Sequence, residues 1–216
     1  MISDELPKIF PNNCSVYACR SANDSVLFEE EKELVKKFTE KPKEQFCMGR
    51  YAAHLCLKDH GQNQAILRKQ SGAPNWPYGI VGSITHTKGL AIAVTGSSDQ
   101  YLGLGIDCER LDRKIKLMVA EKTLHECERS WVFEKEGKEE LRLLHILSAK
   151  EAIFKAFYPI NECYLGFLDA MCTKTENGFV GKLLKQATPE WDCDKSFEIS
   201  THHYEDYLIS SLYLLQ

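Results

Sequence analysis

The sequence predicts an α+β protein of two similar lobes in a pseudo-twofold arrangement, each a small antiparallel sheet packed with helices. Segments typical of helices precede segments typical of strands, and this order occurs twice along the 216 residues. The connection SSDQ between two strand candidates is too short for a parallel crossover, so we expect antiparallel pairing. No low-complexity linker divides the chain, and we expect an N-terminal lobe over 1–100 and a C-terminal lobe over 101–216.

The first half consists of two expected helices followed by three expected strands. Residues 28–38 carry glutamates early and lysines late, which matches the dipole of a helix. Residues 41–60 place apolar side chains on one side of a second helix. The runs 79–85, 90–96 and 101–107 are rich in β-forming residues, and we expect them to form an antiparallel meander.

The second half repeats this order. An irregular helix is expected over 115–134 and a stronger one over 138–157, which Pro159 should end because proline cannot donate the next backbone hydrogen bond. Strands should follow at 166–173, 178–185, 196–201 and 207–215.

Composition and charge argue against some classes of function. The net charge is −4 and the pI about 6.0, so there is no global basic field to attract nucleic acid or anionic lipid. The apolar runs are too short to span a membrane, and the N-terminus lacks the apolar core of a signal peptide. The nine cysteines form no C-x-x-C pair, which favours reduced thiols over a zinc ribbon. We therefore expect a cytoplasmic protein.

The apolar run YLGLGIDCER ends in two carboxylates, which are the first candidates for chemistry. Asp107 and Glu109 are two residues apart, so on a strand both side chains point to the same side. Glu151 lies amid apolar residues of the helix 138–157, and Lys155 shares its face one turn later. Each pair alone is more typical of solvated surface residues than of a metal site. Three carboxylates near one point would need a cation, and Mg²⁺ is suited to that role.

A third polar group lies in the segment 74–94. Ser83 and His86 are close enough in sequence to suggest a catalytic pair, but the G-x-S-x-G turn of serine hydrolases is missing. A cluster of Ser, Thr and His at a strand end could instead bind phosphate oxygens. An ordinary turn with a hydrogen-bonded histidine fits the same residues.

Together these stretches resemble the 4′-phosphopantetheinyl transferases, of the type that activates enterobactin synthetase. The family's metal motif is an apolar run followed by Gly-x-Asp-x-Glu, and its second motif is Ser-x-Lys-Glu-Ala…Lys. WPYGIVGSITHT is similar to its Trp-Pro-x-Gly…Gly-Ser-x-x-His segment, and GRYAAHLCL to its Arg-x-Ala-Ala helix. The resemblance covers about residues 45 to 160. The matching residues are Arg50, Ala52, Ala53, Trp76, Pro77, Gly79, Gly82, Ser83, His86, Gly105, Asp107, Glu109, Ser148, Lys150, Glu151, Ala152 and Lys155.

The resemblance implies the fold of that family and its reaction. The protein would transfer 4′-phosphopantetheine from coenzyme A to a serine of an apo acyl, peptidyl or aryl carrier protein, and release 3′,5′-ADP. The carrier would belong to siderophore assembly of the enterobactin kind, or to another secondary-metabolite, polyketide or fatty acid synthase. The N-terminal lobe would bind coenzyme A, the C-terminal lobe would carry the metal and catalytic residues, and the chain would act as a monomer.

The same resemblance implies roles for individual residues. Mg²⁺ would be held by Asp107, Glu109 and Glu151. Glu151 would also accept the proton of the serine, directly or through a metal-bound water, and Lys155 would neutralise or protonate the leaving phosphate. The contacts to coenzyme A would come from Arg50, Ser83, His86, Lys150 and Lys155. Lys150 could alternatively face solvent, because adjacent helix residues point about 100° apart.

Two other classes of protein fit the same residues. A Mg²⁺-dependent phosphohydrolase would hydrolyse the pyrophosphate of a coenzyme A-like substrate without any carrier protein. A non-catalytic module would only bind coenzyme A or a carrier, although it would have no need of all four residues Asp107, Glu109, Glu151 and Lys155.

Overall fold

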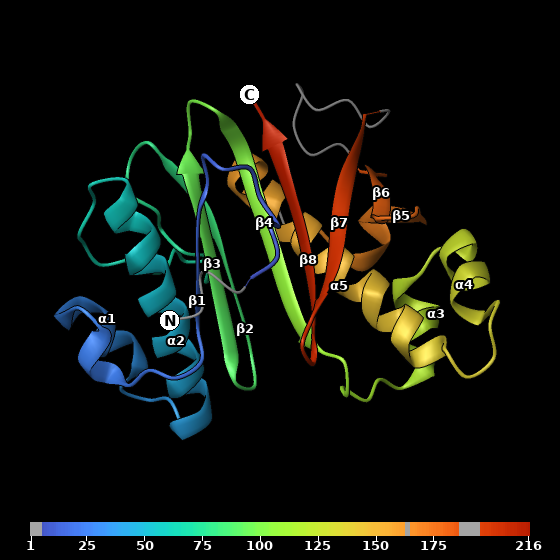
Figure 1. Cartoon of the computed structure of the whole chain (residues 1–216), viewed down its shortest axis with the longest axis horizontal. Helices are drawn as coiled ribbons and strands as arrows, with labels where there is room; N and C mark the ends of the chain where they lie inside the picture. The colour runs from blue at the N-terminus through green and yellow to red at the C-terminus, as the bar shows by residue number, and fades with distance from the viewer. Residues whose placement is uncertain (1–5, 163–164, 186–194) are drawn as a thin grey trace.

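Two antiparallel sheets form the centre of the protein, which a computed structural model describes over residues 6–162, 165–185 and 195–216. The strands are β1 (Ser15–Cys19), β2 (Ile80–Thr87), β3 (Leu90–Ser97), β4 (Tyr101–Arg110), β5 (Ala170–Lys174), β6 (Gly178–Leu183), β7 (Ser196–Tyr204) and β8 (Tyr207–Leu215). The order is β1-β3-β2 in the smaller sheet and β4-β8-β7-β6-β5 in the larger one (Figure 1). The α+β class with antiparallel sheets, expected from the sequence, is confirmed.

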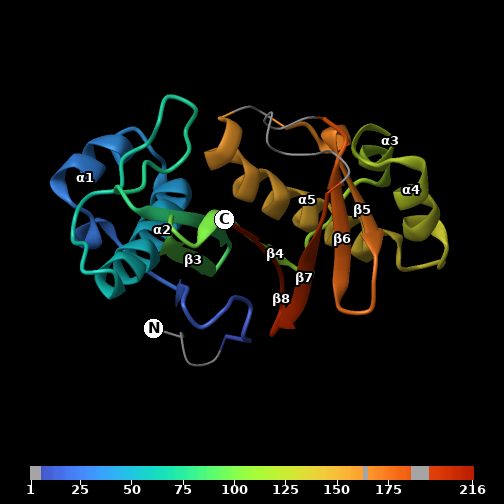
Figure 2. The same cartoon turned by 90° about the horizontal axis from the view of Figure 1, so that it is seen from above.

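Two long helices cover the outer faces of these sheets (Figures 1 and 2). Helix α2 packs against the smaller sheet and α5 against the larger one. The α-helices are α1 (Glu29–Val35), α2 (Glu40–Asp59), α3 (Ala120–Thr123), α4 (Glu126–Phe133) and α5 (Glu139–Asn161), and short 3₁₀ turns are η2 (Asp24–Val26), η3 (Leu117–Val119) and η4 (Phe167–Asp169). Among the described helices, none combines the length and the apolar character needed to cross a lipid bilayer.

Side chains alternate along the strands and so enter two different apolar cores, one on each face of a sheet. On β3, Ala91 faces α2, whereas Ile92 and Val94 face a core that the two sheets share. Leu104 and Ile106 of β4 fill the other side of that shared core. Successive side chains of a strand point to opposite faces, so the residues of β4 that alternate with these two face α5.

Strand β4 differs from the expected meander, because it pairs with β8 and not with β3. Its apolar side chains stack face to face on those of β3 across the shared core, which places β4 in the second sheet. The expected irregular helix over 115–134 is divided into η3, α3 and α4. The five-residue strand β1 was not expected, since SVYAC is too short to stand out in the sequence.

The expectation that Pro159 ends its helix is wrong. Helix α5 continues through Pro159 to Asn161. Glu162 then adopts a left-handed conformation with φ of 49°, and its N–H donates to the carbonyl oxygen of Tyr158. Proline removes one hydrogen bond near the end of the helix, and the packing of buried residues such as Phe157 holds this last turn in place.

Helix α5 lies directly against the backbone of β4 at two glycines. A Cβ atom added at Gly103 would lie 1.9 Å from the carbonyl oxygen of Ala156. One added at Gly105 would lie 2.0 Å from the carbonyl oxygen of Ala152. Neither distance is possible for real atoms, so only glycine allows the helix to approach β4 this closely.

We predict that Gly105→Ala lowers the free energy of unfolding by about 3 kcal/mol, because the new methyl group must displace the backbone of α5. For a chain of this size that is a fall of roughly 6–12 °C in Tm. Gly166→Ala is the control, since a Cβ there would meet Asp169 Oδ2 at an ordinary 3.6 Å. Equal thermal midpoints for the two variants by calorimetry would contradict the close contact.

Candidate active site

Strand β4 is an edge strand of its sheet, and two of its N–H groups donate to hydroxyl groups of β2. The Ile106 N–H donates to Ser83 Oγ at 3.2 Å, and the Cys108 N–H donates to Thr85 Oγ1 at 3.0 Å. Both hydroxyls are buried. Unpaired N–H groups at a buried sheet edge would be costly, so these bonds join the two sheets. They fix the backbone on either side of Asp107.

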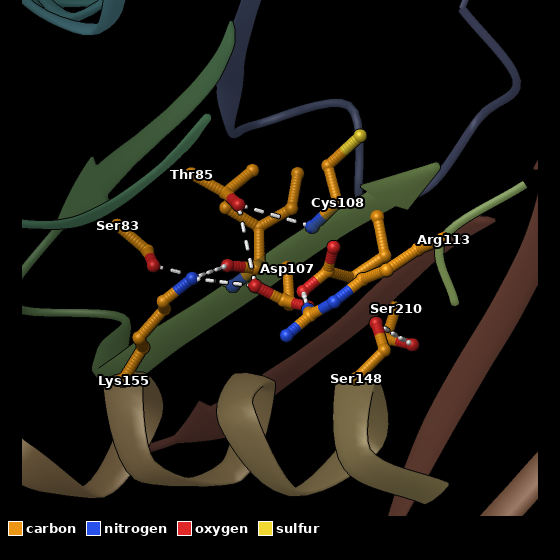
Figure 3. A network of polar contacts seen from close by, with 10 residues as sticks. Ser83, Thr85, Asp107, Cys108, Arg113, Ser148, Lys155 and Ser210 are labelled. Carbon is orange, nitrogen blue, oxygen red and sulfur yellow. Dashed lines mark hydrogen bonds and ion pairs between the residues drawn. The ribbon is translucent and has the colours of Figure 1, made fainter. Parts of the chain in front are cut away.

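The carboxylate of Asp107 is buried and is held by groups from two other elements (Figure 3). Its Oδ1 accepts from Lys155 Nζ at 2.8 Å and from Thr85 Oγ1 at 3.3 Å. Lys155 Nζ also donates to the carbonyl oxygen of Ile106 at 3.0 Å. The second oxygen, Oδ2, is buried and has no hydrogen-bond partner within the described ranges. Asp107 therefore has an oxygen with the capacity to bind a further group.

Glu109 and Glu151 are the other two carboxylates of this region, and basic side chains offset their charge. Glu109 pairs with Arg113, from the loop that follows β4. Burial raises the pKa of Glu109, and the charge of Asp107 raises it further, whereas Arg113 lowers it. Burial also raises the pKa of Glu151, where Lys155 opposes the effect and Asp107 adds to it. The three carboxylates thus repel one another electrostatically.

The expected ligand set of Asp107, Glu109 and Glu151 does not converge on one point. In the part of the chain that the structure describes, no group of three or more His, Cys, Asp or Glu side chains could hold a metal ion. The physical reason is that Lys155 bonds to Asp107 and Arg113 bonds to Glu109. The oxygen donors still suit Mg²⁺, which commonly uses only one or two carboxylates together with substrate phosphates, and Asp107 Oδ2 has no other partner.

A cavity of about 480 Å³ opens beside Lys155, with walls from both halves of the chain. Trp76 and Ser83 line one side, and Phe154 and Tyr158 of α5 line the other. The indole of Trp76 lies over Gly82, where a Cβ would approach the ring within 2.8 Å. An aromatic cavity of this size with a lysine at its side suits an elongated ligand that has an apolar part and an anionic part.

Ser83 and His86 both come from β2, and the structure places them differently. Ser83 lines the cavity, but it is buried and its hydroxyl oxygen already accepts the Ile106 N–H. His86 is exposed at the end of the strand. Partial removal of its ring from water lowers the pKa of His86, and the nearby charges of Lys155 and Arg68 lower it further. The charge of Asp107 acts in the opposite sense and raises the pKa, so basic and acidic side chains both lie near His86.

Arg50 lies in the interior of the N-terminal half, which does not favour the expected contact with a phosphate. It is only 5% exposed, and burial lowers its pKa to about 10. Its Nε lies 3.6 Å from Glu31 Oε1, and its guanidinium carbon lies 4.6 Å from the centre of the Phe46 ring. Arg50 therefore has a buried carboxylate and an aromatic ring as neighbours, which correspond to a structural role.

The structure places Lys150 in neither of the two settings expected from the sequence, which were contact with a ligand and exposure to solvent. Its side chain is fully buried and pairs with Glu128 at 2.8 Å. The helix turns Lys150 away from Asp107, whereas Lys155 of the same helix reaches it. Of the five residues expected to contact coenzyme A, the structure brings Ser83, His86 and Lys155 to one region.

Sequence reasoning did not single out two residues of this region, Thr85 and Arg113. Thr85 bonds to both Asp107 and the Cys108 N–H. Its position two residues after Ser83 on one strand was a usable signal, because both side chains then share a face. Arg113 follows the strand in an irregular loop, where no periodicity indicates the direction of a side chain.

Two family models match most of the chain. The model of the 4′-phosphopantetheinyl transferase N-terminal domain matches residues 30–96, and that of the 4′-phosphopantetheinyl transferase superfamily matches residues 103–210. The structure of the holo-[acyl-carrier-protein] synthase of Thermotoga maritima aligns with 54% of this chain and 64% of its own, at 20% identity and a TM-score of 0.43.

Three relatives share about a third of their aligned residues with the chain. The 4′-phosphopantetheinyl transferase Npt of Nocardia iowensis is 33% identical over 66% of this chain and 64% of its own. The 4′-phosphopantetheinyl transferase PptT of Mycobacterium tuberculosis is 34% identical over 73% of this chain and 70% of its own. The 4′-phosphopantetheinyl transferase Svp of Streptomyces mobaraensis is 34% identical over 68% of this chain and 60% of its own. The match thus spans less than two thirds of the length of Npt and of Svp.

We predict that Thr85→Val lowers the free energy of unfolding by about 1–3 kcal/mol, because it leaves the buried Cys108 N–H without an acceptor. Thr85→Ser keeps the hydroxyl and should lose well under half as much. Urea titrations of both variants and of the parent protein measure the difference. A Val variant as stable as the Ser variant would mean that the hydroxyl does not hold the edge of β4.

Proposed function

Because the chain belongs to the 4′-phosphopantetheinyl transferase superfamily, we propose that it transfers 4′-phosphopantetheine from coenzyme A to a serine of an apo carrier protein. The other product of this reaction is 3′,5′-ADP. The observation that carries the proposal is the position of Lys155, which bonds to Asp107 at the edge of a cavity that both halves of the chain line. This arrangement supports a substrate with a flexible, largely apolar arm and several phosphates.

The two ends of coenzyme A fit different parts of this region. The aromatic walls formed by Trp76, Phe154 and Tyr158 suit the pantetheine arm. The ammonium group of Lys155 suits the pyrophosphate, and the exposed His86, with Lys155 and Arg68 nearby, suits a second phosphate at the end of β2. Ser83 is the weaker candidate, since its oxygen is already an acceptor. We omit Arg50 and Lys150 from the direct contacts, because both are buried beside carboxylates.

Carboxylates next to a pyrophosphate require a cation between them, and Mg²⁺ is the ion that fits these oxygen donors. We propose that Asp107 holds it through the unpartnered Oδ2, and that Glu109 and Glu151 supply further oxygen donors once their side chains turn toward the ion. When bound, the ion would screen the negative charge that develops on the phosphates during transfer.

The reaction itself needs a base and a cation from the chain. The serine oxygen of the carrier bonds to the phosphorus that bears pantetheine, and the bond from that phosphorus to the bridging oxygen breaks. Glu151 accepts the serine proton, because it is the half-buried carboxylate one turn before Lys155 on α5. Lys155 stabilises the charge on the departing 3′,5′-ADP.

The finer parts of the proposal concern context and organisation. We propose carriers of siderophore assembly, or of another secondary-metabolite, polyketide or fatty acid synthase, as the substrates. We divide the chain into a coenzyme A lobe over 1–100 and a catalytic lobe over 101–216, a division supported by family matches that fall on either side of residue 100. A cytoplasmic monomer fits an enzyme that uses coenzyme A and carries both lobes on one chain.

The direct test is to incubate the protein with coenzyme A, Mg²⁺ and purified apo peptidyl and acyl carrier proteins, and to weigh the carriers by mass spectrometry. We expect a carrier to gain the mass of one phosphopantetheine, with 3′,5′-ADP formed in equal amount. Release of free phosphopantetheine without a carrier would instead indicate a phosphohydrolase. Binding of coenzyme A with no product at all would indicate a non-catalytic module.

In the same assay, Glu151→Gln should lower kcat by about 10²–10⁴-fold and change the KM for coenzyme A far less, because glutamine keeps the shape but cannot accept a proton. Glu140→Gln is the matched control, since Glu140 is exposed near the start of the same helix. A loss of less than about tenfold for Glu151→Gln would assign the proton transfer to another group.

A further inference from the structure

Lys150 is one of the largest fully buried side chains of the protein, and the proposed reaction does not use it. Its ammonium group donates to Glu128 Oε2 and to the carbonyl oxygens of Thr123 and Phe167, each at 2.8 Å. An ammonium group has three N–H donors, and all three are therefore occupied. A phosphate could bind to Lys150 only after one of these buried acceptors had lost its partner.

Glu128 completes this cluster from the other side. It is 1% exposed, and its Oε2 also accepts the His125 N–H at 2.7 Å. Its Oε1 accepts the Cys172 N–H at 2.7 Å. Through these bonds the Lys150–Glu128 pair connects α5 with the end of α3, the start of α4, the turn η4 and the strand β5.

The pair lies on the opposite side of α5 from β4. Each helical residue advances about 100°, so Lys150 and Ala152 point in nearly opposite directions. Ala152 touches β4 at Gly105, whereas Lys150 bonds to the segments around α3 and α4. Glu151 lies between these two contacts. A helix held at two opposite faces cannot rotate about its axis, and its other side chains are then fixed in direction.

We propose that Lys150 is a positioning residue, which with Glu128 sets the rotation of α5. It thereby places Lys155 at Asp107 and fixes the direction in which Glu151 leaves the same helix. The kinetic consequence rests on the proposed function, but the buried pair itself does not. A small rotation of the helix would move both side chains relative to the substrate, and misplacement by about 1 Å can cost roughly 100-fold in rate.

Three variants separate positioning from contact with coenzyme A. Lys150→Met leaves Glu128 buried without a counter-ion, so it should lower both Tm and kcat, the latter by about 10- to 100-fold. Adding Glu128→Gln to Lys150→Met removes the unpaired charge and keeps an acceptor for the Cys172 N–H. The double variant should therefore recover much of the lost Tm and of the lost kcat. Lys150→Arg keeps the charge but not the compact shape that three acceptors at 2.8 Å enclose, so it should fail like Lys150→Met.

The split between KM and kcat decides between the two roles. Positioning predicts that the KM for coenzyme A stays within about threefold of the parent value in the double variant. A raised KM in that variant, together with an active Lys150→Arg enzyme, would overturn the proposal and return Lys150 to the binding site.

A measurement on the unaltered protein remains available if the variants do not fold. In protein labelled with ¹⁵N at lysine, the buried ammonium of Lys150 should exchange protons slowly enough to give an NMR signal. Addition of coenzyme A with Mg²⁺ should leave that signal in place, whereas the signal of Lys155 should shift. A Lys150 signal that shifts as much as that of Lys155, or a fast-exchanging Lys150, would contradict the proposal without any reference to turnover.

Discussion

Helix α5 lies so close to β4 that positions 103 and 105 have room only for hydrogen, and the site depends on this contact. Two glycines in a strand weaken it, since they lose more backbone freedom on folding and pack no side chain. These two glycines allow α5 to lie close to the backbone of β4. The short distance lets Lys155 reach both the Asp107 carboxylate and the backbone oxygen of Ile106. A larger residue at either position would lift the helix and separate the lysine from its partners.

The second constraint comes from the smaller sheet. Strand β4 is an edge strand, and the hydroxyl groups of Ser83 and Thr85 accept hydrogen bonds from two of its N–H groups. The two sheets also share one apolar core, so they cannot shift independently. Asp107 is therefore fixed from three directions: by its own strand, by β2 and by α5. Burying a carboxylate costs free energy, and the unpartnered Oδ2 of Asp107 is held in place for a further ligand.

Local pattern in the sequence was sufficient for most of the strands and for the long helices. The family resemblance named Asp107 and Lys155, which the structure brings within hydrogen-bond distance of each other. It failed where the outcome depends on distant contacts. That β4 pairs with β8 follows from face-to-face packing with β3, which the short connection SSDQ does not reveal. Lys150 looked accessible because its partner Glu128 is 22 residues away in sequence. Thr85 shares a strand face with Ser83, but its bond to Asp107 is a tertiary contact. Arg113 pairs with Glu109 from an irregular loop, where no periodicity gives the direction of its side chain.

In the proposed complex one substrate lies between the two halves of the chain, with its pyrophosphate at Lys155 and its counter-ion at Asp107. The most direct measurement is a crystal structure with coenzyme A and Mn²⁺, in which anomalous scattering locates the ion. We expect the ion on Asp107, the pyrophosphate beside Lys155 and the pantetheine arm along Trp76. Coenzyme A bound outside this cavity, or an anomalous signal only at other carboxylates, would contradict this placement of the substrate and the ion.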